Sequence, residues 1–188
     1  MQVELVISHH EEDVSDWVWM EYKHVVELWG SVVFTNVKAL EERRRLAILG
    51  MALEDDFSSY LDGKRYIVLD PCASEVLRTG DLADADAIVV GGILGYERPR
   101  GRTRELITSR AGGAVVRNLG KKQLSVDTAC LVAKMIYLGS SVDEIELTDS
   151  VEIRLSEGES VVLPYGYVVA DGRLILTPGL MEYLSRDR

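Results

Sequence analysis

The stretch VVGGILGYERPRGRTREL, from Val89 to Leu106, decides how the rest of the sequence is interpreted. It begins in an apolar run that predicts a buried strand, continues into three closely spaced glycines, and ends in four arginines at alternate positions. Glycine permits backbone conformations and close approaches that side chains would block. The stretch therefore predicts either a tight turn after a strand or a loop that holds a ligand through its main chain.

The pattern on both sides of this stretch predicts an α/β protein. Strand-like runs alternate with helical runs along most of the chain, which favours a mostly parallel sheet with helices on both faces. The strands are expected at 3–8, 32–37, 66–71, 85–92 and 113–119, and the helices at 15–29, 39–53, 74–80, 102–110 and 125–139. The last fifty residues instead predict antiparallel strands, with Asp171-Gly172 as a hairpin turn and a short helix after Pro178.

Length and charge limit the classes of protein to consider. The chain has 188 residues and a net charge of −10, but the window from Arg98 to Lys122 carries +7, which leaves −17 for the rest. No apolar run reaches the roughly 18 residues of a membrane helix, and a cytoplasmic protein without membrane contact is expected. The two cysteines, Cys72 and Cys130, match no zinc spacing and are expected to be buried.

Three loops follow predicted strands at the edge of a parallel sheet where ligands usually bind. They are LDPCAS (69–74), GGILG (91–95) and LGKKQLS (119–125). The G-G-x-x-G spacing is not the dinucleotide fingerprint, and no acidic residue follows about twenty positions later. Neither glycine nor lysine spacing fits a phosphate-binding loop. A nicotinamide cofactor and phosphoryl transfer are therefore both disfavoured.

The long central motifs carry a family resemblance. GGILGYERPRGRTREL, RNLGKKQLSVDTA and the preceding LDP resemble the SPOUT-class methyltransferases that include the fungal arginine methyltransferase of a small-subunit ribosomal protein and its archaeal relatives. SHHEEDVSDWVWMEY, PYGYVV and TPGLMEYL resemble that family's first and last segments. The resemblance implies an α/β fold whose C-terminal half forms a trefoil knot. Such a knot is rare, because protein chains almost never thread through their own loops. The expected division is a methyltransferase domain at 1–145 and an antiparallel extension at 146–188.

The same resemblance implies that S-adenosylmethionine binds in the knot, between the three loops. The residues expected to hold it are Leu69, Asp70, Pro71, Gly91, Gly92, Ile93, Gly95, Leu119, Gly120, Gln123, Leu124, Ser125 and Thr128. Alternatively, Gln123, Ser125 and Thr128 cap the N-terminus of the helix that follows. After the glycines the chain departs from its relatives, with Tyr96, Glu97, Arg98 and Pro99 at the expected acceptor rim.

Methyl transfer to arginine also requires a group that accepts a proton. A guanidinium has a pKa above about 12, so freeing its lone pair at neutral pH costs on the order of 7 kcal/mol. A carboxylate that orients the guanidinium and takes the proton lowers that cost. The candidates are Asp127, Glu97 and Glu12, and the expected substrate rim adds Glu11, Arg100 and Arg102. The alternative for Asp127 is a capping role at the helix N-terminus, and the alternative for the glutamates is that they are solvated surface charges.

No metal site is expected, because His9 and His10 lack a third well-spaced ligand. Trp17 and Trp29 recur at helical spacing and are assigned to the core. The predicted function is methylation of an arginine in a small-ribosomal-subunit protein. Methylation of rRNA or tRNA, favoured by the +7 window, and a non-catalytic cofactor-binding module are alternatives. Both a homodimer and a monomer are compatible with the sequence.

Overall fold

Parallel strands form the central sheet of the computed structural model, which describes residues 3–95, 101–156 and 158–186. Within these residues the sheet has six strands in the order β3-β2-β1-β5-β4-β6, and all neighbouring pairs are parallel. They are β1 (Glu4–His9), β2 (Val32–Thr35), β3 (Met51–Ala52), β4 (Tyr66–Leu69), β5 (Ala87–Gly92) and β6 (Val115–Arg117). The predicted parallel sheet is thereby confirmed.

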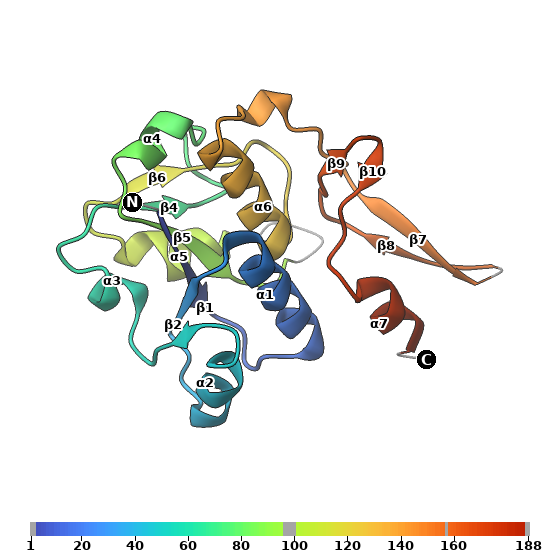
Figure 1. Ribbon diagram of the computed structural model, residues 1–188, viewed down its shortest axis with the longest axis horizontal. Coiled ribbons are helices and arrows are strands. Elements are labelled where there is room, and N and C mark those ends of the chain that lie inside the picture. Colours follow the sequence, from blue (N-terminus) through green and yellow to red (C-terminus); the bar gives the residue numbers. More distant parts are fainter. Residues whose placement is uncertain (1–2, 96–100, 157, 187–188) are drawn as a thin grey trace.

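Helices cover both faces of this sheet (Figure 1). Because successive side chains of a strand point to opposite faces, Leu5 and Ile7 of β1 pack in one apolar cluster and Val6 in another. The first cluster includes α1 and α6, and the second includes α3 and residues beside α5. The helices are α1 (Asp16–Trp29), α2 (Leu40–Leu46), α3 (Phe57–Tyr60), α4 (Thr79–Ala83), α5 (Arg102–Leu106), α6 (Val126–Tyr137) and α7 (Leu180–Arg186), with 3-10 turns at Thr108–Arg110 and Val142–Glu144.

The order of the last three strands brings distant loops together. The chain forms β4 and β5 side by side, crosses to β6 on the far side of β4, and then returns to α6, which packs with α1 over the sheet. Consecutive strands β5 and β6 are therefore separated in the sheet by β4. As a consequence, the segments after β4, β5 and β6 meet at one end of the sheet.

Several expected boundaries were wrong. The helix expected at 39–53 ends at Leu46, and Met51 instead pairs with Val33 as a short edge strand. Gly50 makes this possible, since a Cβ there would lie 2.3 Å from the carbonyl oxygen of Val32. The turn expected at 74–80 forms later, as α4, because Val76 bridges to Asn118. The helix expected at 102–110 continues past α5 only as the 3-10 turn.

The C-terminal residues form two antiparallel pairs, as predicted. One is β7 (Val151–Ser156) with β8 (Glu159–Leu163), and the other is β9 (Val169–Ala170) with β10 (Arg173–Leu174). Asp171 and Gly172 join β9 to β10 with φ of 51° and 70°, the left-handed values of a two-residue hairpin turn. Figure 1 shows α7 beside α1, and β7 and β8 extending away from the central sheet. The division into 1–145 and 146–188 stays a prediction.

An apolar contact joins the C-terminal segment to α1. Leu163, Tyr167 and Leu180 are buried in one apolar cluster, against which Trp17 and Met20 of α1 pack. The side chain of Thr177 also reaches Asp127 on α6. Among the described residues, none of the helices is long and apolar enough to cross a membrane.

Candidate functional site

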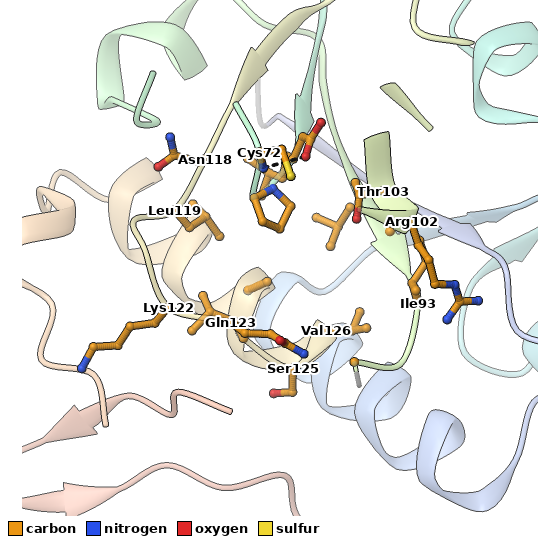
Figure 2. A pocket seen from close by; sticks show the side chains of 18 of the residues that line it. Cys72, Ile93, Arg102, Thr103, Asn118, Leu119, Lys122, Gln123, Ser125 and Val126 are labelled. Atoms are coloured by element: carbon orange, nitrogen blue, oxygen red, sulfur yellow. Dashed lines mark hydrogen bonds between the residues drawn. The ribbon is translucent and has the colours of Figure 1, made fainter. Parts of the chain in front are cut away.

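The three predicted loops surround a cavity of about 270 Å³ at the carboxyl ends of β4, β5 and β6. We call this space the main cavity. Figure 2 shows Ile93 and Arg102 on one side of it and Leu119 and Lys122 on the other. Its lining residues are 69–72, 90–91, 93–95, 101–103, 118–126 and 129.

Most of the residues predicted to hold the cofactor line this cavity. They are Leu69, Asp70, Pro71, Gly91, Ile93, Gly95, Leu119, Gly120, Gln123, Leu124 and Ser125. Gly92 and Thr128 do not line it. A Cβ on Gly92 would lie 2.1 Å from the hydroxyl oxygen of Tyr22, so this glycine allows β5 to pack against α1. Thr128 is buried, and its hydroxyl lies 2.8 Å from that of Ser125.

Side-chain hydrogen bonds fix the first and third loops. The Asp70 carboxylate is buried, accepting from the backbone N–H of Cys72 at 2.8 Å and from the Thr108 hydroxyl at 2.9 Å. Asn118 accepts from Gly120 N–H and donates to the Ala73 carbonyl. Asp70 therefore shapes its loop through contacts within the protein. Cys72, expected to be buried, is exposed and lines the cavity, while Cys130 is buried as predicted.

Glu11 holds the second loop, which contains the glycines. Its Oε1 atom accepts from Leu94 N–H at 3.0 Å and from Arg102 Nη1 at 3.2 Å. Arg102 also donates to the His10 carbonyl at 3.3 Å, and its side chain lines the main cavity. Two of the predicted rim residues, Glu11 and Arg102, thus lie together.

A close approach at Gly95 joins this loop to the C-terminal segment. A Cβ at position 95 would lie 2.4 Å from Gln123 Nε2 and 2.5 Å from Tyr165 Cε1. The Tyr165 hydroxyl donates to the Gly95 carbonyl at 2.6 Å. The absence of a side chain at Gly95 therefore lets the glycine loop pack directly against Tyr165 and Gln123.

A smaller cavity of about 150 Å³ adjoins the main one, and we call it the side cavity. Both cavities are lined by Leu94, Gly95, Ser125 and Val126. The side cavity adds Trp17 and Glu21 from α1 and Tyr165 from the C-terminal segment. Two aromatic side chains and one carboxylate therefore form the part of its wall that the main cavity lacks.

Glu21 is a buried carboxylate with specific partners. One oxygen accepts from Trp17 Nε1 at 2.7 Å and the other from Val126 N–H at 3.1 Å. Burial and, secondly, the nearby Asp127 carboxylate raise the pKa of Glu21 to about 8. At neutral pH this side chain is therefore mostly protonated, and it ionises as the pH rises through about 8.

The predicted catalytic residues lie in different places. Asp127 is buried and lines neither cavity. Its carboxylate accepts from His24 Nδ1, the Thr177 and Ser125 hydroxyls and Thr128 N–H, at 2.7–2.9 Å. Glu12 is exposed beyond β1 and also lines neither cavity. Glu97 and Arg100 lie outside the described residues.

Burial disfavours the charged forms of His9, the last residue of β1, and of His10, which follows it. Burial lowers the pKa of His9, and it lowers that of His10 to about 4. His9 Nδ1 lies 2.8 Å from the Tyr22 hydroxyl, and His10 Nε2 lies 2.9 Å from the Ser8 hydroxyl. Over 3–95, 101–156 and 158–186, no group of three or more histidine, cysteine, aspartate or glutamate side chains is arranged to hold a metal.

Comparison with known proteins gives the family. A model of the family "Protein arginine N-methyltransferase SFM1-like" matches residues 4–188. The chain belongs to this SFM1-like family. Protein arginine N-methyltransferase SFM1 of Saccharomyces cerevisiae is 30% identical over 200 residues, which cover 97% of this chain and 94% of the yeast protein.

Solved structures agree with this membership. The crystal structure of the yeast arginine methyltransferase SFM1 complexed with SAM has a TM-score of 0.90 at 28% identity, covering 100% of this chain and 92% of that one. A dual specific Trm10 from Thermococcus kodakaraensis has a TM-score of 0.57 at 20% identity, covering 75% of this chain and 96% of that one, and shares the fold. The predicted SPOUT-class α/β fold and the family resemblance are confirmed.

The sequence pattern missed three residues that line the side cavity of this SFM1-like protein: Trp17, Glu21 and Tyr165. Trp17 was assigned to the core, but it is partly exposed and lines the side cavity. The i, i+4 spacing of Trp17 and Glu21 places both on one helix face, a signal that was available. Their position beside Gly95 depends on packing between distant segments, which the spacing does not reveal.

Ion pairs neutralise much of the basic window in this SFM1-like chain. Each of the following basic side chains lies within 4.0 Å of a carboxylate: Arg102 with Glu11, Arg104 with Asp70, Arg110 with Asp56, Arg117 with Asp81, and Lys122 with Asp149. Arg98 lies outside the described residues. Paired charges attract a polyanion less than the same number of free ones, so the window is a weaker nucleic-acid signal than its sequence suggested.

Proposed function

We propose that this protein transfers a methyl group from S-adenosylmethionine to an arginine of a small-ribosomal-subunit protein. The observation that carries the proposal is the family match over residues 4–188, combined with a cavity built from the three loops that the family resemblance implied. The yeast relatives are named as arginine methyltransferases, and one solved structure is of a complex with SAM.

The main cavity fits such a cofactor by size and by lining. Its volume of about 270 Å³ is close to the lower end of small-molecule sites, roughly 300–1,000 Å³. Leu69, Ile93, Leu119 and Leu124 offer apolar walls, and the loop glycines leave main-chain groups accessible. The Arg102 guanidinium pairs with Glu11, and it can also bind the carboxylate of the cofactor. When bound, the cofactor supplies an electrophilic methyl group on a sulfonium.

The residues of this chain position the reactants and accept the proton that the guanidinium loses. Glu11 and Tyr165 hold the glycine loop, and Ser125 stands where the two cavities meet. Of the predicted proton acceptors, we infer for Asp127 an indirect role, because four donors already occupy its carboxylate. Glu12 and Glu97 remain candidates for the acceptor rim.

Charge favours a protein acceptor over RNA. The chain has a net charge of −10, and the described part of its basic window is largely paired with carboxylates. RNA binding depends on unpaired cationic groups that neutralise phosphates. A cationic protein segment instead gains from an acidic surface. The Trm10 likeness, at 20% identity, concerns the fold only.

The experiment separates the protein, RNA and non-catalytic alternatives. The protein is incubated with methyl-labelled S-adenosylmethionine and small ribosomal subunits, which are then digested with ribonuclease or with protease. We expect label that survives ribonuclease, runs with one protein and yields methylarginine after acid hydrolysis. A Gly95→Trp variant, whose new side chain would occupy the space of Gln123 and Tyr165, is the blocked control. Label lost to ribonuclease, or cofactor binding without transfer, contradicts the proposal.

A further inference from the structure

The side cavity has a chemical character of its own. It combines a buried carboxylate, Glu21, with the rings of Trp17 and Tyr165, and it shares four lining residues with the main cavity. We propose that the side cavity receives the acceptor guanidinium and that Glu21 is the carboxylate that orients it and takes its proton. This inference rests on the proposed function and assigns the acceptor site within it.

The chemistry of the walls favours a planar cation. A buried carboxylate is costly unless it is paired with a cation or fully hydrogen-bonded. The N–H groups that donate to Glu21, from the Trp17 indole and from the backbone of α6, are neutral, so they do not balance its charge when it ionises. A guanidinium offers several N–H donors in one plane and stacks favourably on aromatic rings. Trp17 and Tyr165 provide such rings on the same cavity.

The position of Glu21 also suits the transfer. Leu94, Gly95, Ser125 and Val126 line both cavities, so a group in the side cavity lies next to the main one. Such placement removes much of the entropic cost of bringing two reactants together. One terminal nitrogen of the guanidinium gives its lone pair to the methyl carbon. The carbon–sulfur bond pair stays on sulfur, and the N–H proton passes to Glu21.

Charges balance in this step. A guanidinium cation, a sulfonium cation and the Glu21 carboxylate become a methylguanidinium cation, a neutral thioether and a protonated Glu21. The raised pKa of Glu21 makes it a stronger base than an exposed glutamate. Burial is the main cause of this rise and the Asp127 carboxylate is the second.

Other titratable groups face Glu21 from each neighbouring element. They are Asp127 and Cys130 on α6, Tyr165 and Tyr167 on the C-terminal segment, and Tyr22 on α1. Burial raises the pKa of each of the tyrosines and of Cys130, so all four are neutral near pH 8. Asp127 is therefore the neighbour whose charge raises the pKa of Glu21. It acts on the transfer through Glu21 and is a positioning residue.

The test uses a small guanidinium probe, N-acetylarginine amide, and its neutral isostere, N-acetylcitrulline amide. Each is titrated into the full-length protein while the indole N–H signal of Trp17, assigned with a Trp17→Phe variant, is followed by NMR. We expect the arginine probe to shift this signal and the citrulline probe to leave it unchanged. Between pH 6.5 and 9 the affinity for the arginine probe should rise at least tenfold, because Glu21 ionises in this range.

Two variants of α1 complete the test. Glu21→Gln should weaken binding of the arginine probe at least tenfold and lower kcat/KM with ribosomal subunits at least about a hundredfold. Its affinity for S-adenosylmethionine should stay within about threefold of the wild type. Glu27→Gln, at an exposed glutamate of the same helix, should change neither quantity.

The outcomes separate this inference from the proposed function. Unchanged probe binding or unchanged methyl transfer in Glu21→Gln overturns the assignment of Glu21. A pH-independent affinity in the wild type overturns it as well, even if the variant does not fold. If the wild type labels no ribosomal protein, the proposed function fails, while the probe titration still decides whether Glu21 binds a guanidinium.

Discussion

His24 Nδ1 lies 2.8 Å from Oδ2 of Asp127, and this hydrogen bond joins α1 to α6 close to Glu21. The same carboxylate oxygen accepts from the Thr177 hydroxyl, and the other accepts from Ser125. The buried Asp127 carboxylate therefore connects three parts of the protein. They are α1, which lines the side cavity, Ser125, which lines both cavities, and the C-terminal segment.

Removal of the Asp127 carboxylate should destabilise the protein strongly. Asp127→Ala leaves four buried donors without their acceptor, and we expect the free energy of unfolding in urea to fall by about 3 kcal/mol or more. Asp62→Ala, at an exposed aspartate, should change it by less than about 0.5 kcal/mol. Equal stabilities of the two variants would show that the network contributes nothing.

Asp127→Asn, which keeps the size of the side chain, should act on the pH profile. It removes the charge that helps to raise the pKa of Glu21, so the rise of kcat/KM with pH should shift to lower pH. The wild-type rise should be centred near pH 8, and kcat/KM should be measured from pH 6 to 9.5 with ribosomal subunits as acceptor. An unshifted rise in an Asp127→Asn variant that still folds would contradict the electrostatic link.

The raised pKa of Glu21 also makes stability depend on pH. The folded state retains the Glu21 proton up to about pH 8, whereas the unfolded chain releases it near 4.5. The unfolding free energy therefore falls as the pH rises between these values. Glu21→Gln lacks this loss, so its stability relative to the wild type should increase by on the order of a few kcal/mol from pH 6 to pH 9. A constant difference in urea unfolding would show that Glu21 is ionised throughout.

Local sequence patterns predicted the three loops around the main cavity and missed the residues of the side cavity. Periodicity and glycine spacing placed the three loops at one edge of a parallel sheet, because these signals are local. The edge strand at Met51 was missed because its pairing depends on close packing between Gly50 and Val32. Glu21 was missed for a similar reason. Its burial and its raised pKa arise only where α1 packs against α6 and Tyr165.

Glu11 should control the affinity for the cofactor without touching it. Its carboxylate holds Leu94 N–H and Arg102, so Glu11→Ala should loosen the glycine loop and weaken S-adenosylmethionine binding at least tenfold by calorimetry. Glu11→Gln keeps one acceptor oxygen and should have an intermediate affinity. Glu41→Ala, whose glutamate pairs with Arg44 on the surface of α2, is the control. Wild-type affinity in Glu11→Ala would exclude this role.

Acid should destabilise the protein partly through His10. Burial lowers its folded-state pKa to about 4, whereas the unfolded chain takes up this proton near pH 6.5. The unfolded state binds more protons in between, so stability is lost as the pH falls from about 6.5 to about 4. His10→Gln removes this proton uptake, and the loss between pH 7 and pH 5 should shrink by on the order of 1 kcal/mol. Identical losses in the two proteins would mean that His10 is charged when folded.

Two glycine-to-alanine changes should have opposite effects. In Gly95→Ala the new Cβ would lie 2.4 Å from Gln123 and 2.5 Å from Tyr165, so both side chains must shift. We expect this variant to lose about 1 kcal/mol of stability and at least tenfold in affinity for S-adenosylmethionine.

Gly80→Ala is the matched control within α4. A Cβ at Gly80 meets nothing within 4 Å, and its φ is not in the left-handed region. Alanine there restricts the unfolded chain and should raise the free energy of unfolding by about 0.5 kcal/mol, with cofactor affinity unchanged. Urea unfolding and calorimetry on the two variants provide the comparison. If Gly95→Ala bound the cofactor as well as Gly80→Ala does, Tyr165 would not be needed in its observed position for the main cavity to function.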